Sequence, residues 1–182
     1  APSYMSVTYG AGGGTSAYTV SIAAGIQNQF RVPVMAHLSC ISSTREGVRH
    51  QLDTMRQTGI QNILALRGDL APGASVEQDW DYHYASELVW EIREYGGFCV
   101  GGACYPEGHI ESPNQAEDIA NLKKKVDAGC DFLTTQMFFD NNIYYNFLYK
   151  VREAGIQVPV VAGIMPVTNV RQIARITALS GT

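Results

Sequence analysis

The sequence is poor in charged residues, which make up 16% of its 182 residues, whereas apolar residues make up 46%. The high share of apolar residues excludes a disordered chain. The length of 182 residues is enough for one domain with a substantial core. No basic block exists beyond Lys123–Lys125, and the net charge is −4. We therefore do not expect a nucleic acid as the main partner.

The sequence also lacks an apolar run of about 18 residues, the length that a membrane-spanning helix requires, and no signal-peptide pattern opens it. We expect no membrane association and a cytoplasmic location. No Walker loop occurs. The G-x-G-x-x-G fingerprint fails as well, because Thr15 stands where its third glycine would be.

Cysteine pairs with C-x-x-C spacing are absent among the four cysteines. Cys99 and Cys104 lie five residues apart in one expected strand, so their side chains point to opposite faces. This spacing argues against a disulfide or a shared metal between the two. We expect reduced thiols and no metal site.

What the sequence does contain is a strand-like run followed by a helical pattern, repeated at a period of about 30 residues. The expected strands are Tyr4–Tyr9, Val32–Leu38, Asn62–Leu66, Phe98–Tyr105, Phe132–Phe138 and Val158–Ile164. The expected helices lie near Ser16–Phe30, Thr44–Thr58, Tyr84–Tyr95, Asn114–Ala128 and Asn141–Ala154, with a further one starting near Asn169. Glycines that stop helices follow four of them, at Gly59, Gly96, Gly129 and Gly155.

Strand–helix alternation predicts an α/β fold with parallel strands and right-handed crossovers. An open doubly wound sheet and a closed (β/α)8 barrel of the TIM type are the two candidates. The barrel usually needs about 250 residues, so this chain would supply about six of its eight units. We expect one domain over residues 1–182, a barrel that is incomplete at both ends.

Polar residues and glycines gather where the expected strands end, in "TYGAGGG", "AHLSC", "LRGD", "YPEGH", "TQMFFD" and "GIMPVTN". In parallel α/β folds the carboxyl ends of the strands meet at one edge and carry the active site. Arg67 and Asp69 should therefore line the mouth of a pocket. An exposed Arg-Gly-Asp adhesion tripeptide is the less favoured alternative, because the tripeptide directly follows an apolar run.

Two further patterns leave alternatives open. On the expected helix 114–128, Asp118, Asn121 and Lys125 share one stripe, which could hold a ribose and a pyrophosphate or could be a solvated face. The aromatic cluster in residues 80–84 could cover a flat ligand or be an ordinary packed loop.

The motifs "SVTYGAGGGT", "AHLSCI", "ILALRGDLAPG", "YASELV", "CYPEGH", "NLKKKVDAG", "TTQMFFD" and "GIMPVTN" together resemble the methylenetetrahydrofolate reductase family. The resemblance implies an eightfold barrel with bound FAD that reduces 5,10-methylenetetrahydrofolate to 5-methyltetrahydrofolate, in one-carbon metabolism and methionine synthesis. It implies NADH or NADPH as the reductant, which gives a hydride to the flavin and leaves before the folate binds. We also expect a homo-oligomer.

Matching motif by motif, the resemblance implies roles for individual residues. Asp69 corresponds to a catalytic carboxylate near the flavin and the folate pterin, where it would disfavour the anionic reduced flavin and favour a cationic folate iminium. The substrate contacts would be Gln136 and Gln172. The cofactor-binding positions would be Thr8, Tyr9, Ala11, His37, Arg67, Gly68, Asp69, Tyr84, Tyr105, His109, Asp118, Asn121, Lys124 and Lys125.

One departure from the family pattern concerns the acid that opens the methylene bridge. The family places this glutamate in an aromatic-rich "FEFFP"-type motif on the first barrel strand, and no such motif occurs here. Glu107 corresponds to a different position. Two alternatives therefore stay open: a truncated or degenerate module that binds FAD or folate, and a flavin barrel reduced by a partner protein.

Overall fold

The computed structural model describes residues 2–8, 16–69, 80–169 and 173. Within these residues, strands alternate with helices along the whole chain. In order, the elements are β1 (Met5–Val7), α1 (Ser16–Phe30), β2 (Val34–Ser39), α2 (Arg45–Gln57), β3 (Asn62–Leu66), α3 (Ala85–Tyr95), β4 (Cys99–Cys104), α4 (Gln115–Asp127), β5 (Phe132–Thr135), α5 (Asn141–Glu153) and β6 (Val160–Val161).

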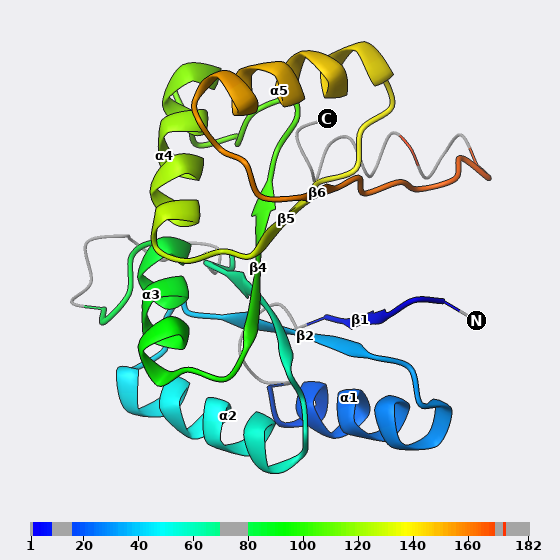
Figure 1. The fold of residues 1–182 in the computed structure, drawn as a ribbon, viewed down its shortest axis with the longest axis vertical. Helices are drawn as coiled ribbons and strands as arrows, with labels where there is room; N and C mark the ends of the chain where they lie inside the picture. Colours follow the sequence, from blue (N-terminus) through cyan, green and yellow to red (C-terminus); the bar gives the residue numbers. More distant parts are fainter. Residues whose placement is uncertain (1, 9–15, 70–79, 170–172, 174–182) are drawn as a thin grey trace.

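The described strands form one parallel sheet in which each strand pairs with the next along the chain, from β1 to β6. A doubly wound sheet would reverse this order and place helices on both faces. Here the strand order never reverses. In Figure 1 the helices run around the outside, from α1 at the bottom through α2 and α3 to α4 and α5 at the top, with the strands inside.

The sheet is therefore a curled half-barrel, and the parallel α/β prediction is confirmed. The open doubly wound alternative is wrong, because nothing in the strand order gives it a switch point. The eight-unit count stays a prediction, since six strands lie within the residues that the structure describes.

Alternation along each strand separates the outer face of the sheet from the inner face. On β2, Val34, Ala36 and Leu38 are buried against the helices, where they pack in one cluster with Leu52 and Met55 of α2. A second cluster joins β5 to the α5 side through Leu133, Phe147, Val151 and Ile156. These apolar contacts hold the helices on the outer face and leave the inner face for a cavity.

Local signals fix the helix ends as the sequence predicts. Thr44 caps α2 by accepting a hydrogen bond from the Gly47 N–H at 3.0 Å, and Asn114 caps α4 by accepting from the Glu117 N–H at 2.9 Å. Gly59 and Gly155 follow α2 and α5 with φ of +77°, the left-handed region that glycine enters without strain.

The two outermost strands are shorter than the sequence patterns suggest. The pattern predicts Tyr4–Tyr9 and Val158–Ile164, whereas β1 covers Met5–Val7 and β6 covers Val160–Val161. In the described sheet each has a neighbour on one side only, so fewer backbone hydrogen bonds hold it in the sheet. None of the described helices is long and apolar enough to cross a membrane.

Candidate functional site: a cavity at the carboxyl ends of the strands

A cavity of about 460 Å³ lies on the inner face of the sheet, along β1 to β5, and reaches the carboxyl ends of β3, β4 and β5. Its apolar walls come from Met35 on β2, Leu64 and Leu66 on β3, and Ala103 on β4. These residues occupy alternate strand positions, so their side chains leave the outer face free for the helices. The sheet thus supplies both a core and a pocket from one set of strands.

Seven of the residues that the sequence assigns to a site line this one cavity. They come from strand ends that lie far apart in the sequence, as expected when parallel strands finish at a common edge. These residues are His37, Arg67, Gly68, Asp69, Tyr105, His109 and Gln136.

Gly68 explains why a glycine separates the cation from the carboxylate after β3. Its φ is +91°, and a Cβ there would collide with the Ser39 hydroxyl and lie 2.9 Å from Ile41 Cγ2. The Ser39 hydroxyl donates to the Arg67 carbonyl at 2.8 Å, and the Ile41 N–H donates to the same oxygen at 2.7 Å. Backbone contacts therefore fix this strand end against the segment after β2, and Asp69 follows it at the cavity rim.

The Arg67 guanidinium makes a two-pronged ion pair across the mouth of the cavity. Its Nη1 and Nη2 atoms donate to the two carboxylate oxygens of Glu111 at 2.5 and 2.6 Å. This pairing raises the pKa of Arg67 and lowers that of Glu111. Both groups are charged at neutral pH, so the contact is a true ion pair.

His37 reaches into the cavity from β2 and shares a hydrogen bond of 2.6 Å between its Nε2 and the Ser6 hydroxyl on β1. Burial lowers the pKa of His37, so the ring is neutral at pH 7. A neutral ring with one nitrogen engaged by Ser6 presents a single defined donor or acceptor at its other nitrogen.

Tyr105 and His109 flank the cavity on the β4 side, where their rings meet edge to face with centroids 4.7 Å apart. Burial raises the pKa of the Tyr105 phenol, and the nearby carboxylates of Asp69 and Asp118 raise it further. Tyr105 is therefore a neutral hydrogen-bonding group at physiological pH and not a phenolate.

The predicted stripe on α4 divides into an inner and an outer part. Asp118 is buried and accepts a hydrogen bond from the Ser112 hydroxyl at 3.2 Å. Lys125 is half-buried, and its Nζ donates to the carbonyl of Ala103, a cavity residue, at 2.7 Å. A Cβ on Gly102 would lie 3.0 Å from Lys125 Cδ, so this glycine makes room for the lysine stem.

The outer part of the stripe is solvated. Asn121 and Lys124 are both exposed, and Lys124 Nζ donates to the Asn121 side-chain oxygen at 3.0 Å. The solvated alternative therefore applies to Asn121, whereas binding of a ribose and a pyrophosphate by Asp118 and Lys125 stays a prediction. Asp118 and Lys125 are not among the cavity-lining residues, although Lys125 contacts the backbone of Ala103, which is; Asn121 and Lys124 face solvent.

Several predicted residues lie elsewhere. Thr8 is exposed and does not line the cavity, although its carbonyl accepts from Thr19 Oγ1 at 3.1 Å. Tyr84, at the start of α3, is 65% exposed and also lies outside the cavity lining. Tyr9, Ala11, Gln172 and the helix expected beyond Asn169 fall outside the described residues, and their roles stay predictions.

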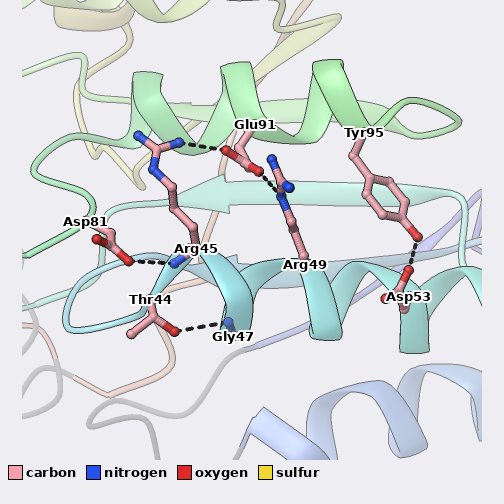
Figure 2. Close-up of polar contacts among 8 residues, drawn as sticks. All are labelled: Thr44, Arg45, Gly47, Arg49, Asp53, Asp81, Glu91 and Tyr95. Atoms are coloured by element: carbon pink, nitrogen blue, oxygen red, sulfur yellow. Dashed lines mark hydrogen bonds and ion pairs between the residues drawn. The ribbon is translucent and has the colours of Figure 1, made fainter.

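The aromatic segment before α3 is packed at Tyr82 and exposed at Tyr84, and a role in covering a ligand stays a prediction. Tyr82 is fully buried, with the Arg45 guanidinium 5.3 Å from its ring centroid. Figure 2 shows polar contacts that join this loop to α2 and α2 to α3: the Arg45 N–H donates to Asp81, and both Arg45 and Arg49 of α2 donate to Glu91 of α3, at 2.8 and 2.6 Å. These contacts form a polar seam between α2 and α3 that also holds Asp81 of the preceding loop.

The cysteines are free thiols that burial keeps protonated. Burial raises the pKa of Cys40 and of Cys104 to about 12, and that of Cys130 to about 11. A protonated thiol is a poor nucleophile. In the described part of the chain, no three His, Cys, Asp or Glu side chains are arranged to hold a metal ion.

The sequence model of the methylenetetrahydrofolate reductase family matches residues 1–182. The chain belongs to this family. Methylenetetrahydrofolate reductase (NADH) 1 of Arabidopsis thaliana is 40% identical over 196 residues, which cover 100% of this chain and 33% of the relative. The 5,10-methylenetetrahydrofolate reductase of Salmonella typhimurium is 40% identical over 171 residues, covering 94% of this chain and 56% of the relative. The chain thus spans between a third and little more than half of these methylenetetrahydrofolate reductases.

Solved structures support the fold. A phosphonopyruvate hydrolase complex with oxalate and Mg++ superposes with a TM-score of 0.61 at 15% identity, covering 90% of this chain and 56% of that one. An uncharacterized protein from Clostridium thermocellum that binds two copies of 5-methyl-5,6,7,8-tetrahydrofolic acid superposes with a TM-score of 0.54 at 15% identity, covering 87% and 54%. At this identity the likeness shows the architecture alone.

The cavity residues fit the flavin that the family resemblance implies. Ligand pockets typically measure about 300–1,000 Å³, and this cavity, at about 460 Å³, combines apolar walls for a flat ring with polar groups at the rim. Within the described residues, two buried hydroxyls have no hydrogen-bond partner, that of Tyr82 in the loop before α3 and that of Thr134, which lies in the cavity wall. Such an orphaned polar atom is rare in a finished core and fits a wall that faces a polar ligand.

Sequence reasoning missed other residues of this site, among them three polar ones that make or lack a specific contact. Ser6 pairs with His37, Thr134 lies in the wall, and Glu111 pairs with Arg67. Thr134 had a usable signal, because it lies two residues before Gln136 and therefore on the same face of the strand. Ser6 and Glu111 had none, since each contact depends on how two distant segments meet.

Proposed function

We propose that the chain forms the flavin-binding catalytic half-barrel of an enzyme that reduces 5,10-methylenetetrahydrofolate to 5-methyltetrahydrofolate with NADH or NADPH. The observation that carries the proposal is the cavity at the strand ends, lined by His37, Arg67, Asp69 and Gln136, in a chain of the methylenetetrahydrofolate reductase family. Because the chain spans only part of its relatives, the activity is proposed for the whole protein.

FAD, when bound, supplies the redox chemistry by accepting a hydride from the reduced nicotinamide and delivering it to the methylene carbon of the folate. The chain's own residues would bind and orient the cofactor. Arg67 and Lys125 supply positive charge for phosphates, and Asp118 supplies a buried carboxylate for a ribose hydroxyl. Neutral His37, held by Ser6, would donate to or accept from a ring edge.

Asp69 has an electrostatic role in this proposal. Its carboxylate at the cavity rim raises the energy of negative charge nearby and lowers that of positive charge. It thereby favours departure of a hydride from the cofactor and stabilises a cationic folate iminium. The Gln136 side-chain amide, on the same rim, is suited to hydrogen-bond the polar edge of the folate pterin.

The test is turnover by the purified protein supplied with FAD, with NADH or NADPH in parallel, and with 5,10-methylenetetrahydrofolate under anaerobic conditions. The proposal predicts stoichiometric nicotinamide oxidation and 5-methyltetrahydrofolate, identified by mass spectrometry. If the folate were reduced with a chemical reductant but with neither NADH nor NADPH, the result would favour a flavin barrel that a partner protein reduces. Binding of FAD and folate without reduction would identify a non-catalytic module.

A further inference from the structure

Glu111 is the described side chain that pairs with Arg67, and its surroundings differ from those of its partner. The Arg67 side chain is 20% exposed, whereas that of Glu111 is 52% exposed. Within the described residues, the Glu111 carboxylate has no hydrogen-bond partner besides Arg67. Arg67 is therefore the fixed member of the pair, and Glu111 is the member that can swing into solvent.

The contact uses the end of the guanidinium that recognises planar, two-oxygen anions. Both terminal nitrogens of Arg67 donate to Glu111, and its Nε points back to the Gly68 carbonyl at 3.3 Å. Carboxylates and phosphates fit this fork in the same way. An anionic group bound at the cavity mouth would therefore compete with Glu111 for the same donors.

Position also connects Glu111 to the cavity. Its backbone N–H donates to Nδ1 of His109 at 3.1 Å, and His109 lines the cavity beside Tyr105. Displacing the Glu111 side chain need not move this backbone contact, because only the carboxylate would leave Arg67. The residue is thus anchored at the rim while its charged end remains free to exchange.

We propose that the Glu111 carboxylate competes with the phosphate groups of the flavin dinucleotide for the Arg67 guanidinium, and that this competition sets how fast and how tightly FAD binds. The inference rests on the proposed function. In it, Glu111 acts through Arg67 and touches neither substrate nor cofactor. Neutralising Glu111 should free the guanidinium before FAD arrives, so the association rate should rise while the dissociation rate stays unchanged.

The experiment compares FAD binding to the wild-type protein, Glu111→Gln and Glu107→Gln by stopped-flow flavin fluorescence and equilibrium titration. Glu107 is an exposed carboxylate in the same segment, so it controls for loss of a negative charge near the cavity. The proposal predicts that Glu111→Gln associates about 2- to 5-fold faster, the range for releasing a partly exposed ion pair, with an unchanged dissociation rate. Glu107→Gln should change association by less than half as much.

A double-mutant comparison shows whether the effect passes through Arg67. In the Arg67→Met background, Glu111→Gln should no longer accelerate association beyond the Glu107→Gln control. An unchanged or slower association of Glu111→Gln, or faster dissociation, would overturn the proposal and make Glu111 an aid to binding. Failure of the wild-type protein to bind FAD would instead defeat the proposed function, and the inference would fall with it.

Discussion

At the scale of single residues, the Arg67–Gly68–Asp69 strand end shows how three consecutive residues contribute differently to one site. Gly68 supplies a backbone conformation and a close approach to Ser39 that another residue could not adopt without strain. Arg67 is held by backbone contacts on one side and by Glu111 on the other. Asp69 is left at the cavity rim, where its charge can act on a bound ligand.

Asp69→Asn should separate the two half-reactions. The substitution keeps the shape and removes the charge, so flavin reduction by nicotinamide should be preserved or become faster. Folate reduction should slow roughly 5- to 30-fold, corresponding to about 1–2 kcal/mol of lost transition-state stabilisation. Stopped-flow absorbance of each half-reaction measures both. Equal losses in the two steps would indicate a collapsed site, and unchanged rates would remove Asp69 from the mechanism.

At the scale of elements, α4 carries three consecutive lysines, of which the first and the third have different surroundings. Lys125 Nζ reaches the Ala103 carbonyl beside the cavity, whereas Lys123 forms an i,i+4 ion pair with Asp127 on the helix surface. Their side chains point in directions about 160° apart, at about 100° per residue. One helix therefore turns one lysine toward the sheet and another toward solvent.

Lys125→Met should weaken FAD binding by about tenfold or more, whereas Lys123→Met should leave it nearly unchanged. One charge-assisted contact to a phosphate contributes roughly 1.5–3 kcal/mol. Methionine retains an apolar stem over Gly102 and so limits the loss of packing. Equilibrium dissociation constants from flavin fluorescence quenching test this, and equal constants for the two variants would refute the role given to Lys125.

The seam between α2 and α3 makes a stability prediction. Glu91 is 1% exposed and accepts from both Arg45 and Arg49, so Glu91→Gln leaves two cations facing a neutral amide. We expect a loss of about 1–2 kcal/mol in the free energy of unfolding, less than a fully buried pair would cost, because both arginine side chains are at least half exposed.

Urea denaturation of Glu91→Gln beside Asp53→Asn checks this value. Asp53 accepts a hydrogen bond from the Tyr95 hydroxyl across the same two helices but is exposed. Asp53→Asn should therefore lower the free energy of unfolding clearly less than Glu91→Gln. Figure 2 shows the two contacts side by side along the seam. Equal shifts in the urea midpoint would mean that the burial of Glu91 does not determine its contribution.

At the scale of the whole molecule, the order of elements was predictable because the separate local signals in the sequence indicate the same strands and helices. Apolar runs, caps and stop glycines give α1 as Ser16–Phe30 and β3 as Asn62–Leu66, the ranges that the structure has. Polar strand ends also led to most of the cavity, since parallel strands bring their carboxyl ends together. The half-barrel follows from strand order alone.

What could not be predicted depends on contacts between segments far apart in the chain. Glu91 lies in the buried stripe of α3 with Leu88 and Ile92, where a carboxylate requires a cationic partner. The sequence does not indicate which arginine or lysine that partner is. Glu111 meets Arg67 from a loop 44 residues away. Tyr84 matched a family motif, yet it stands exposed at the start of α3 and away from the cavity lining, so its role remains a prediction.

The central claim is that the cavity on the inner face holds the flavin, and blocking the cavity tests it most directly. Ala103 lines the cavity from β4, paired in register with Thr134 of β5, so Ala103→Leu should fill the space without disturbing the outer core. Ala116→Leu, at an exposed position of α4, controls for added bulk.

Equilibrium titration with FAD, with circular dichroism to verify the fold, compares these two variants with the wild-type protein. The account predicts that wild type and Ala116→Leu bind FAD alike, and that Ala103→Leu binds at least about tenfold more weakly, a loss of about 1.4 kcal/mol, with its fold intact. If a folded Ala103→Leu protein bound FAD as tightly as wild type, the flavin could not lie in this cavity.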